Sequence, residues 1–129
     1  MSEDFEPARA TPQGPLMIDG YRPGGFTIGG RRHDGPVVVL EASVLAWSPG
    51  EVPALTLDDF AGVLEAEPRP EILILGSGPG FVMASAALRA QLREHGIALE
   101  CMASAAACRT YNLLRAEDRR VAAALLPAG

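Results

Sequence analysis

The sequence contains no lysine, and all 11 of its basic residues are arginine. Without lysine the chain cannot form a Schiff base, place an ammonium group over a nucleotide phosphate in a P-loop, or use a lysine of lowered pKa as a base. Enzymes that depend on any of these three functions are therefore excluded.

Cysteine and histidine are also scarce, with two residues of each. Cys101 falls near the end of an expected strand and Cys108 inside an expected helix, so we expect two reduced thiols rather than a disulfide framework. A zinc site would also have to recruit His33 and His95, which lie far apart in the sequence. We therefore expect neither a metal nor a cofactor.

Long apolar runs are missing as well. No run approaches the roughly 20 residues that a membrane-spanning helix needs. The first residues do not have the positively charged start and apolar segment of a signal peptide. We expect a cytoplasmic protein that does not insert into membranes.

Charge is distributed unevenly, within a net charge of −5. Residues 1–86 hold 5 arginines against 12 acidic residues, whereas residues 87–129 hold 6 arginines against 4 acidic residues. An acidic surface repels a phosphate backbone, and affinity for nucleic acid comes mainly from clustered cations. Nucleic acid is therefore not an expected partner.

The length and the 48% apolar content are typical of one globular domain. Residues 1–15 contain three prolines and no periodicity, so we expect a flexible arm there and a single domain at residues 16–129. Short β-favouring runs separated by glycine-rich turns come first, and alternating strands and helices follow. The final run could be a helix because of its alanines, but we predict a strand because it leads directly to Pro127. The expected strands are 16–18, 26–28, 37–40, 44–47, 72–75, 97–101 and 120–126, and the expected helices are 57–65, 84–95 and 105–116.

A glycine-rich segment, Gly76-Ser77-Gly78-Pro79-Gly80, follows the strand expected at 72–75. It does not match the dinucleotide-binding pattern G-x-G-x-x-G, because Phe81 stands where the third glycine belongs. Proline also offers no N–H donor to an anion. The segment is either a structural turn or one wall of a small ligand or anion site.

The position of this loop follows from topology. If the strands at 72–75 and 97–101 are parallel neighbours, their carboxyl ends meet at one edge of the sheet, and the loop faces Ala103-Ser104. Ser104 is placed to cap the next helix, whose first N–H groups would point into the same crevice. Ser104 is then either a cap alone or part of the site.

The helix expected at 105–116 carries three further candidates, Arg109, Tyr111 and Asn112. We expect Arg109 and Asn112 to share one side, opposite an apolar side that includes Leu113. Arg109 is either a structural clamp or a group that recognises an anion or a partner, and Asn112 either fixes a loop or joins that site. The ring of Tyr111 belongs in the core, with its hydroxyl on a polar partner. No nucleophile, base and acid combine in a known pattern, so we assign no catalytic residue.

Several short segments combine over residues 16 to 127. They include Gly76-Ser77-Gly78, Gly96-Ile97, Ile18-Asp19-Gly20-Tyr21, Gly25-Phe26, Trp47-Ser48-Pro49, the run from Ala106 to Asn112 and the run from Arg119 to Pro127. Together they resemble the Mth-domain family, a family of largely unknown function that includes mitochondrial complex I assembly factor 3 and many bacterial proteins. Members commonly have Asp-Thr where this chain has Ala103-Ser104, and Gly-Thr-Gly where it has Gly76-Ser77-Gly78. The missing carboxylate at Ala103 argues against acid–base catalysis there.

The resemblance implies a three-layer α/β fold with a mixed central sheet and a β-rich N-terminal part, and it implies no accepted enzymatic activity. The expected function is a non-catalytic interaction or assembly factor with a protein partner. The alternative is a small-ligand or anion-binding protein, including an unrecognised enzyme, that uses the crevice between Gly76–Gly80 and Ser104.

Overall fold

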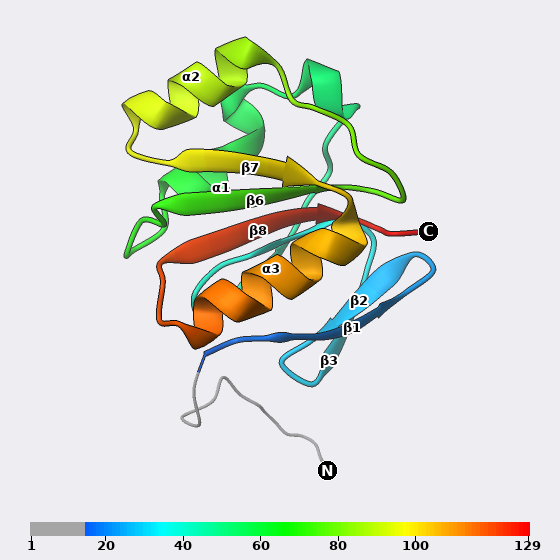
Figure 1. Ribbon diagram of the computed structural model, residues 1–129. Helices are drawn as coiled ribbons and strands as arrows, with labels where there is room; N and C mark the ends of the chain where they lie inside the picture. The colour runs from blue at the N-terminus through cyan, green and yellow to red at the C-terminus, as the bar shows by residue number, and fades with distance from the viewer. Residues whose placement is uncertain (1–14) are drawn as a thin grey trace.

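The computed structural model describes residues 15–129, so the arm predicted at residues 1–15 lies outside the described residues except for Pro15. Two β-sheets and three α-helices make up the described chain (Figure 1). In chain order the elements are β1 (Ile18–Arg22), β2 (Gly25–Ile28), β3 (Arg31–Asp34), β4 (Val37–Val39), β5 (Val44–Ala46), the 3-10 helices η2 (Val52–Ala54) and η3 (Leu57–Phe60), α1 (Ala61–Leu64), β6 (Ile72–Ser77), α2 (Ala86–Glu94), β7 (Ala98–Met102), α3 (Ser104–Ala116) and β8 (Val121–Leu126).

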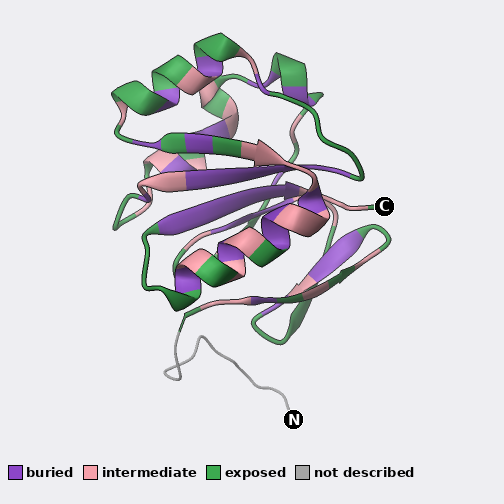
Figure 2. Cartoon of the chain, viewed as in Figure 1, coloured by how far each residue is buried: buried purple, intermediate pink, exposed green. Residues whose placement is uncertain are grey.

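The central sheet has five strands in the order β5-β4-β8-β6-β7. Strand β6 runs parallel to both β7 and β8, whereas β4 is antiparallel to β8 and β5. Strands β6 and β8 lie in the interior of the sheet and are buried almost throughout (Figure 2). Continuous apolar runs such as these are typical of strands that are covered on both faces.

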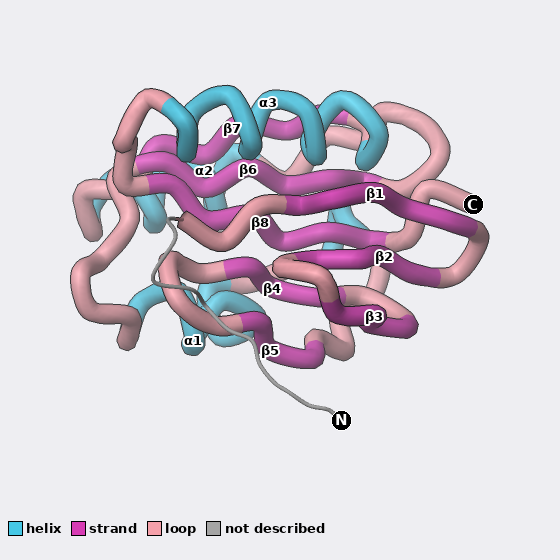
Figure 3. Tube along the Cα trace, turned by 90° about the horizontal axis from the view of Figure 1, so that it is seen from below, coloured by secondary structure: helices cyan, strands magenta, loops and turns pink. Residues whose placement is uncertain are grey.

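Layers of different kinds cover the two faces. Helices α1, α2, η2 and η3 pack on one face, and α3 packs on the other together with the antiparallel sheet β1-β2-β3 (Figures 1 and 3). Successive side chains of β6 point to opposite faces, so Leu73 and Leu75 join the first core and Ile74 joins the second. The three-layer α/β fold with a mixed sheet is therefore confirmed.

Several local predictions hold and others do not. The strand at the end of the chain is confirmed as β8, and β6 and β7 are parallel neighbours with Ile72 opposite Ala98. The sequence did not indicate β3, whose four residues are all polar. The helix expected at 57–65 is a 3-10 turn followed by the short helix α1.

The buried side of α3 differs from the expected one. Leu113, which we expected in the core, is 60% exposed. The buried residues of the helix are Ser104, Ala107, Cys108, Tyr111 and Arg115. The expectation was wrong for Leu113, because the face that meets the sheet takes in Ser104 and Arg115 instead of this leucine. None of the helices in residues 15–129 is long and apolar enough to cross a membrane.

Candidate functional site

The predicted crevice lies at the edge of the central sheet where β6, β7 and β8 end. Gly76 and Ser77 are the last residues of β6, and Ser104 begins α3 beside them. A Cβ atom on Gly76 would lie 2.8 Å from Oγ of Ser104. The prediction that Gly76 and Ser104 meet at the same edge is therefore confirmed.

Ser104 does not cap α3. The N-cap is Ala103, and Ser104 is the first helical residue and fully buried. The Ser104 hydroxyl accepts a hydrogen bond from the N–H of Gly78 at 2.9 Å and donates one to the carbonyl oxygen of Leu126 at 2.5 Å. The Ser104 N–H also donates to the Gly78 carbonyl at 2.9 Å. The predicted cap is wrong because this hydroxyl ties the β6 loop to the end of β8 instead.

Two glycines make this close approach possible. At Gly76 there is no room for a side chain, since a Cβ atom would also lie 2.8 Å from Cδ2 of Leu125. Gly78 has a φ of 101°, a conformation that glycine adopts far more readily than other residues. Gly76 is thus explained by packing, and Gly78 by backbone geometry.

Ser77 fixes the loop that leads to α2. Its hydroxyl lies 2.6 Å from the carbonyl oxygen of Gly80 and 3.2 Å from that of Met102, and it accepts the N–H of Val82 at 2.9 Å. The loop therefore presents a defined backbone. Phe81 and Met83, which follow it, are 59% and 52% exposed, and Val82 between them is exposed as well.

The candidates on α3 lie away from this cluster. Tyr111 is seven residues beyond Ser104, about 10 Å along the helix axis, and its buried hydroxyl donates to the carbonyl oxygen of Leu16 at 2.9 Å. Asn112 binds the backbone of Ile18 through both groups of its amide. Arg109 is exposed and forms no hydrogen bond or ion pair with another described residue. Gly76, Ser77, Gly78 and Ser104 therefore come together, whereas Tyr111 and Asn112 hold β1 and Arg109 faces solvent.

Burial determines the ionisation of two groups on α3. Burial raises the pKa of the Tyr111 phenol to about 12, so the phenol stays protonated at neutral pH. Burial likewise raises the pKa of the Cys108 thiol to about 11, which suppresses the nucleophilic thiolate. Both Cys101 and Cys108 are free thiols.

The polar side chains predicted for the crevice already have hydrogen-bond partners within the chain. The hydroxyls of Ser77 and Ser104 already donate to carbonyl oxygens, and the Gly78 N–H is already bonded. Within residues 15–129 no three histidine, cysteine, aspartate or glutamate side chains gather where they could hold a metal ion. An open hollow of about 350 Å³ lies elsewhere, between η3 and α2, beside Asp58, Ser85 and Gln91. The geometry does not support a ligand or anion site at the crevice.

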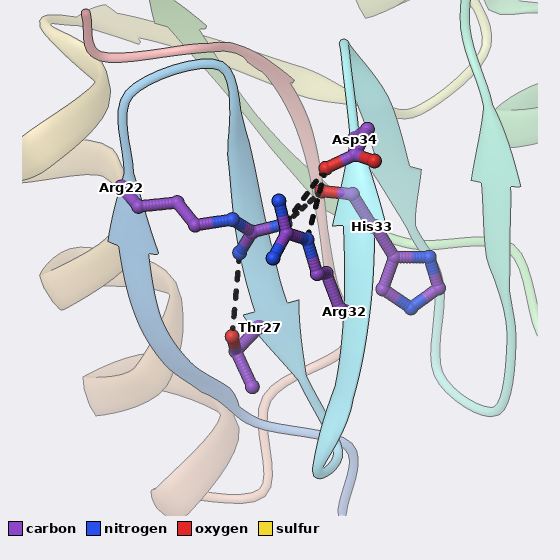
Figure 4. A network of polar contacts seen from close by, with 5 residues as sticks. All are labelled: Arg22, Thr27, Arg32, His33 and Asp34. Carbon is purple, nitrogen blue, oxygen red and sulfur yellow. Dashed lines mark hydrogen bonds and ion pairs between the residues drawn. The ribbon is translucent and has the colours of Figure 1, made fainter.

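Sequence analysis missed a network in the three-stranded sheet (Figure 4). The Arg22 guanidinium donates to Asp34 Oδ1 at 2.9 Å, to the His33 carbonyl at 3.3 Å and to Thr27 Oγ1 at 3.4 Å, and so joins β1, β2 and β3. Hydrogen bonds from Arg22 and Arg32 lower the pKa of Asp34. Burial, with the nearby Arg31 and Arg22 charges, lowers the pKa of His33. The contacts of Arg22 therefore hold the three strands of this sheet together.

Arg115 is the second residue that the sequence did not single out. It is 7% exposed, and its Nη1 donates to the carbonyl oxygen of Arg119 at 2.9 Å, which fixes the turn from α3 to β8. Its Nε is buried without a partner among the described residues. The only sequence signal is its place on the buried face, four residues after Tyr111.

The sequence and the fold are both similar to those of known proteins. A family described as protein of unknown function (DUF498/DUF598) matches residues 18–126. The chain belongs to this family. The expected membership of the Mth-domain group is confirmed, since the solution structure of a Bordetella pertussis protein described as an Mth938-like domain has a TM-score of 0.75 at 27% identity and covers 98% of this chain and 94% of that one.

Other relatives carry different names. The human NADH dehydrogenase (ubiquinone) 1 alpha subcomplex assembly factor 3 is 37% identical over 112 residues, which cover 87% of this chain and 61% of that protein. An uncharacterized protein of Rhodobacter capsulatus is 35% identical over 114 residues, which cover 88% of this chain and 86% of that protein. A crystal structure described as an outer membrane protein from Bartonella henselae has a TM-score of 0.79 at 34% identity, with 88% of this chain and 96% of that one covered. The chain thus spans about 61% of the length of the human relative.

Proposed function

We propose that this chain is a non-catalytic factor that binds other proteins and assists their assembly, specifically the assembly of an NADH dehydrogenase complex. The support is its similarity to proteins named as assembly factors of that complex, at 35% identity in zebrafish and 37% in human. The proposal extends to this chain a role that belongs by name to longer relatives.

One structural observation supports a role in protein interaction. Phe81, Val82 and Met83 form a run of exposed large apolar side chains, which we call the apolar loop. The backbone around it is fixed by the Ser77 hydroxyl and by the bonds between Gly78 and Ser104. Exposed apolar clusters mark interaction sites. A loop that is already ordered also loses less conformational entropy on binding than a mobile one.

A complementation experiment tests the proposal. The gene is deleted in its native host, and assembled NADH dehydrogenase is measured by native gel electrophoresis and by NADH oxidation in membranes. We expect the wild-type gene to restore the complex and the double variant Phe81→Ser, Met83→Ser to restore little of it. Tyr21→Ser, which removes a similarly exposed large side chain from β1, is the matched control and should restore it fully.

Two results would contradict the proposal. Normal assembly of the complex in the deletion strain would remove the assigned role. Full restoration by the Phe81→Ser, Met83→Ser variant would place the interaction on another surface. A cytoplasmic location, favoured by the sequence, stays a prediction that fractionation of the host cells tests directly.

A further inference from the structure

Strand β7 is one of the four edge strands of the two sheets in the described chain. The other three outer strands are covered, short or charged. Asn112 occupies the backbone of β1 at Ile18, β5 has three residues, and β3 has exposed charges at Arg31, Arg32 and Asp34. Charge, shortness and coverage are the means by which proteins prevent pairing at sheet edges. Strand β7 has five residues and only one charged side chain, Glu100.

The free backbone groups of β7 can be identified. The Ala98 N–H donates to the Glu71 carbonyl, so Ala98, Glu100 and Met102 direct their backbone groups toward β6. Because backbone groups alternate along a strand, those of Leu99 and Cys101 point away from the sheet. Within residues 15–129, the Leu99 N–H and both backbone groups of Cys101 have no hydrogen-bond partner. Leu99 is only 3% exposed and Cys101 is half-buried, so an incoming strand must displace the side chain that covers them.

One side chain covers this edge. Arg89, on α2, donates through Nη1 to the Leu99 carbonyl at 2.8 Å. Its Nη2 lies 3.0 Å from Sδ of Met83 and 3.9 Å from Sγ of Cys101. The end of the apolar loop therefore lies against the same edge, and the loop passes the carboxyl end of β7 (Figure 1).

We propose that the outer edge of β7 binds an extended segment of a partner protein that carries a basic residue opposite Glu100. This inference rests on the proposed interaction function and names its surface. Main-chain hydrogen bonds at Leu99 and Cys101 supply the affinity, in the manner of strand addition at a sheet edge. The Arg89 guanidinium donates to the Leu99 carbonyl oxygen, which is the acceptor that an N–H of the incoming segment needs. Arg89 must therefore move away when the segment binds.

The charge of Glu100 selects the occupant. In an antiparallel pair of two β7 strands in full overlap, Leu99 lies opposite Cys101 and Glu100 lies opposite the second Glu100. Like charges directly opposite each other destabilise a strand pair, whereas opposite charges stabilise it. Glu100 is exposed and forms no ion pair with any other described residue. A basic residue on a different protein therefore suits this position better than a second copy of the chain.

Two synthetic peptides test the proposal on the purified full chain. Both are acetylated and amidated: Thr-Val-Thr-Lys-Thr-Val-Thr, and the same peptide with Glu in place of Lys. Titration is followed by the amide resonances and exchange rates of Leu99 and Cys101. We expect the lysine peptide to shift and protect these amides. It should bind roughly two- to thirtyfold more tightly than the glutamate peptide, because lysine gains an attraction to Glu100 and glutamate meets a repulsion of similar size.

Three variants sharpen the test. Glu100→Lys should reverse the preference between the peptides. Arg89→Ala should tighten binding of both peptides, because it frees the Leu99 carbonyl. Cys101→Pro should abolish binding, because proline removes the outward N–H. If Cys101→Pro does not fold, the reversal by Glu100→Lys remains decisive.

Each other outcome overturns the proposal. These outcomes are no shift at Leu99 and Cys101, equal affinity for the two peptides, or shifts confined to another surface. Protection of the same amides in protein alone, rising with concentration and accompanied by a doubled mass, would assign the edge to a second copy. Peptide binding uses purified protein, so it can fail while complementation succeeds, and the two hypotheses are separated.

Discussion

The side-chain amide of Asn112 pairs with the backbone of Ile18 as a neighbouring strand would. Its Oδ1 accepts the Ile18 N–H at 2.9 Å, and its Nδ2 donates to the Ile18 carbonyl at 2.7 Å. Tyr111, the preceding residue, binds the Leu16 carbonyl. Adjacent residues of α3 thus attach the start of β1 to this helix, which packs on the same face of the central sheet, and α3 runs beside β1 in both views (Figures 1 and 3).

Replacing Asn112 should therefore lower stability. Asn112→Ala leaves the Ile18 N–H and carbonyl without partners, at a cost of about 1–3 kcal/mol in the free energy of unfolding. Thermal and urea unfolding measure this change, and roughly 2–8 °C of melting temperature corresponds to each kcal/mol. Asn112→Asp, which keeps the acceptor and loses the donor, should fall between wild type and alanine. Wild-type melting of Asn112→Ala would show that these bonds contribute nothing.

Gly76 provides a second test of packing. Gly76→Ala places a methyl group 2.8 Å from both Ser104 Oγ and Leu125 Cδ2, so the ends of β6, β8 and α3 must move apart. Overpacking of this kind costs about 1–3 kcal/mol. The matched control is Gly80→Ala, because a Cβ atom at Gly80 meets nothing within 4 Å. Equal denaturation midpoints for the two variants would contradict the close approach.

The arrangement of β6, β7 and α3 could be predicted because apolar runs, glycines and the right-handed crossover rule determine it. That rule also brought Gly76 and Ser104 to one edge. The direction of the Ser104 hydroxyl could not be predicted, because its acceptor is Leu126, 22 residues away. That acceptor exists only once β8 has joined the sheet.

Strand β3 could not be predicted for a related reason. Its sequence, Arg31-Arg32-His33-Asp34, has no alternation of apolar and polar residues. Pairing with β2 and the Arg22 guanidinium hold it in place. The apolar loop, by contrast, had a visible signal: three large apolar residues stand between a glycine-rich turn and Ser85, the N-cap of α2.

His33 should make stability depend on pH. Its folded-state pKa is lowered below the ordinary value of 6.5, so the unfolded chain binds the proton more tightly. The stability that follows is present above about pH 6.5 and is lost as the pH falls toward the folded-state pKa. We expect the melting temperature to fall between pH 7 and pH 5, and to fall less in His33→Gln. An equal fall in both proteins would assign the dependence to other groups.

Substitution of Arg109 tests whether this residue acts in binding or in folding. Its guanidinium is exposed and has no partner among the described residues, so Arg109→Ala should change the free energy of unfolding by no more than about 0.5 kcal/mol. The same exposure leaves five N–H donors free for the carboxylate or carbonyl groups of a partner. We therefore expect Arg109→Ala to melt as wild type does and to restore less NADH dehydrogenase in the deletion strain. Arg109→Lys, which keeps the charge and loses the planar fork, should restore an intermediate amount. Unfolding of Arg109→Ala would make this residue a structural clamp, and full restoration by a stable Arg109→Ala would leave the apolar loop and the β7 edge as the surfaces that bind.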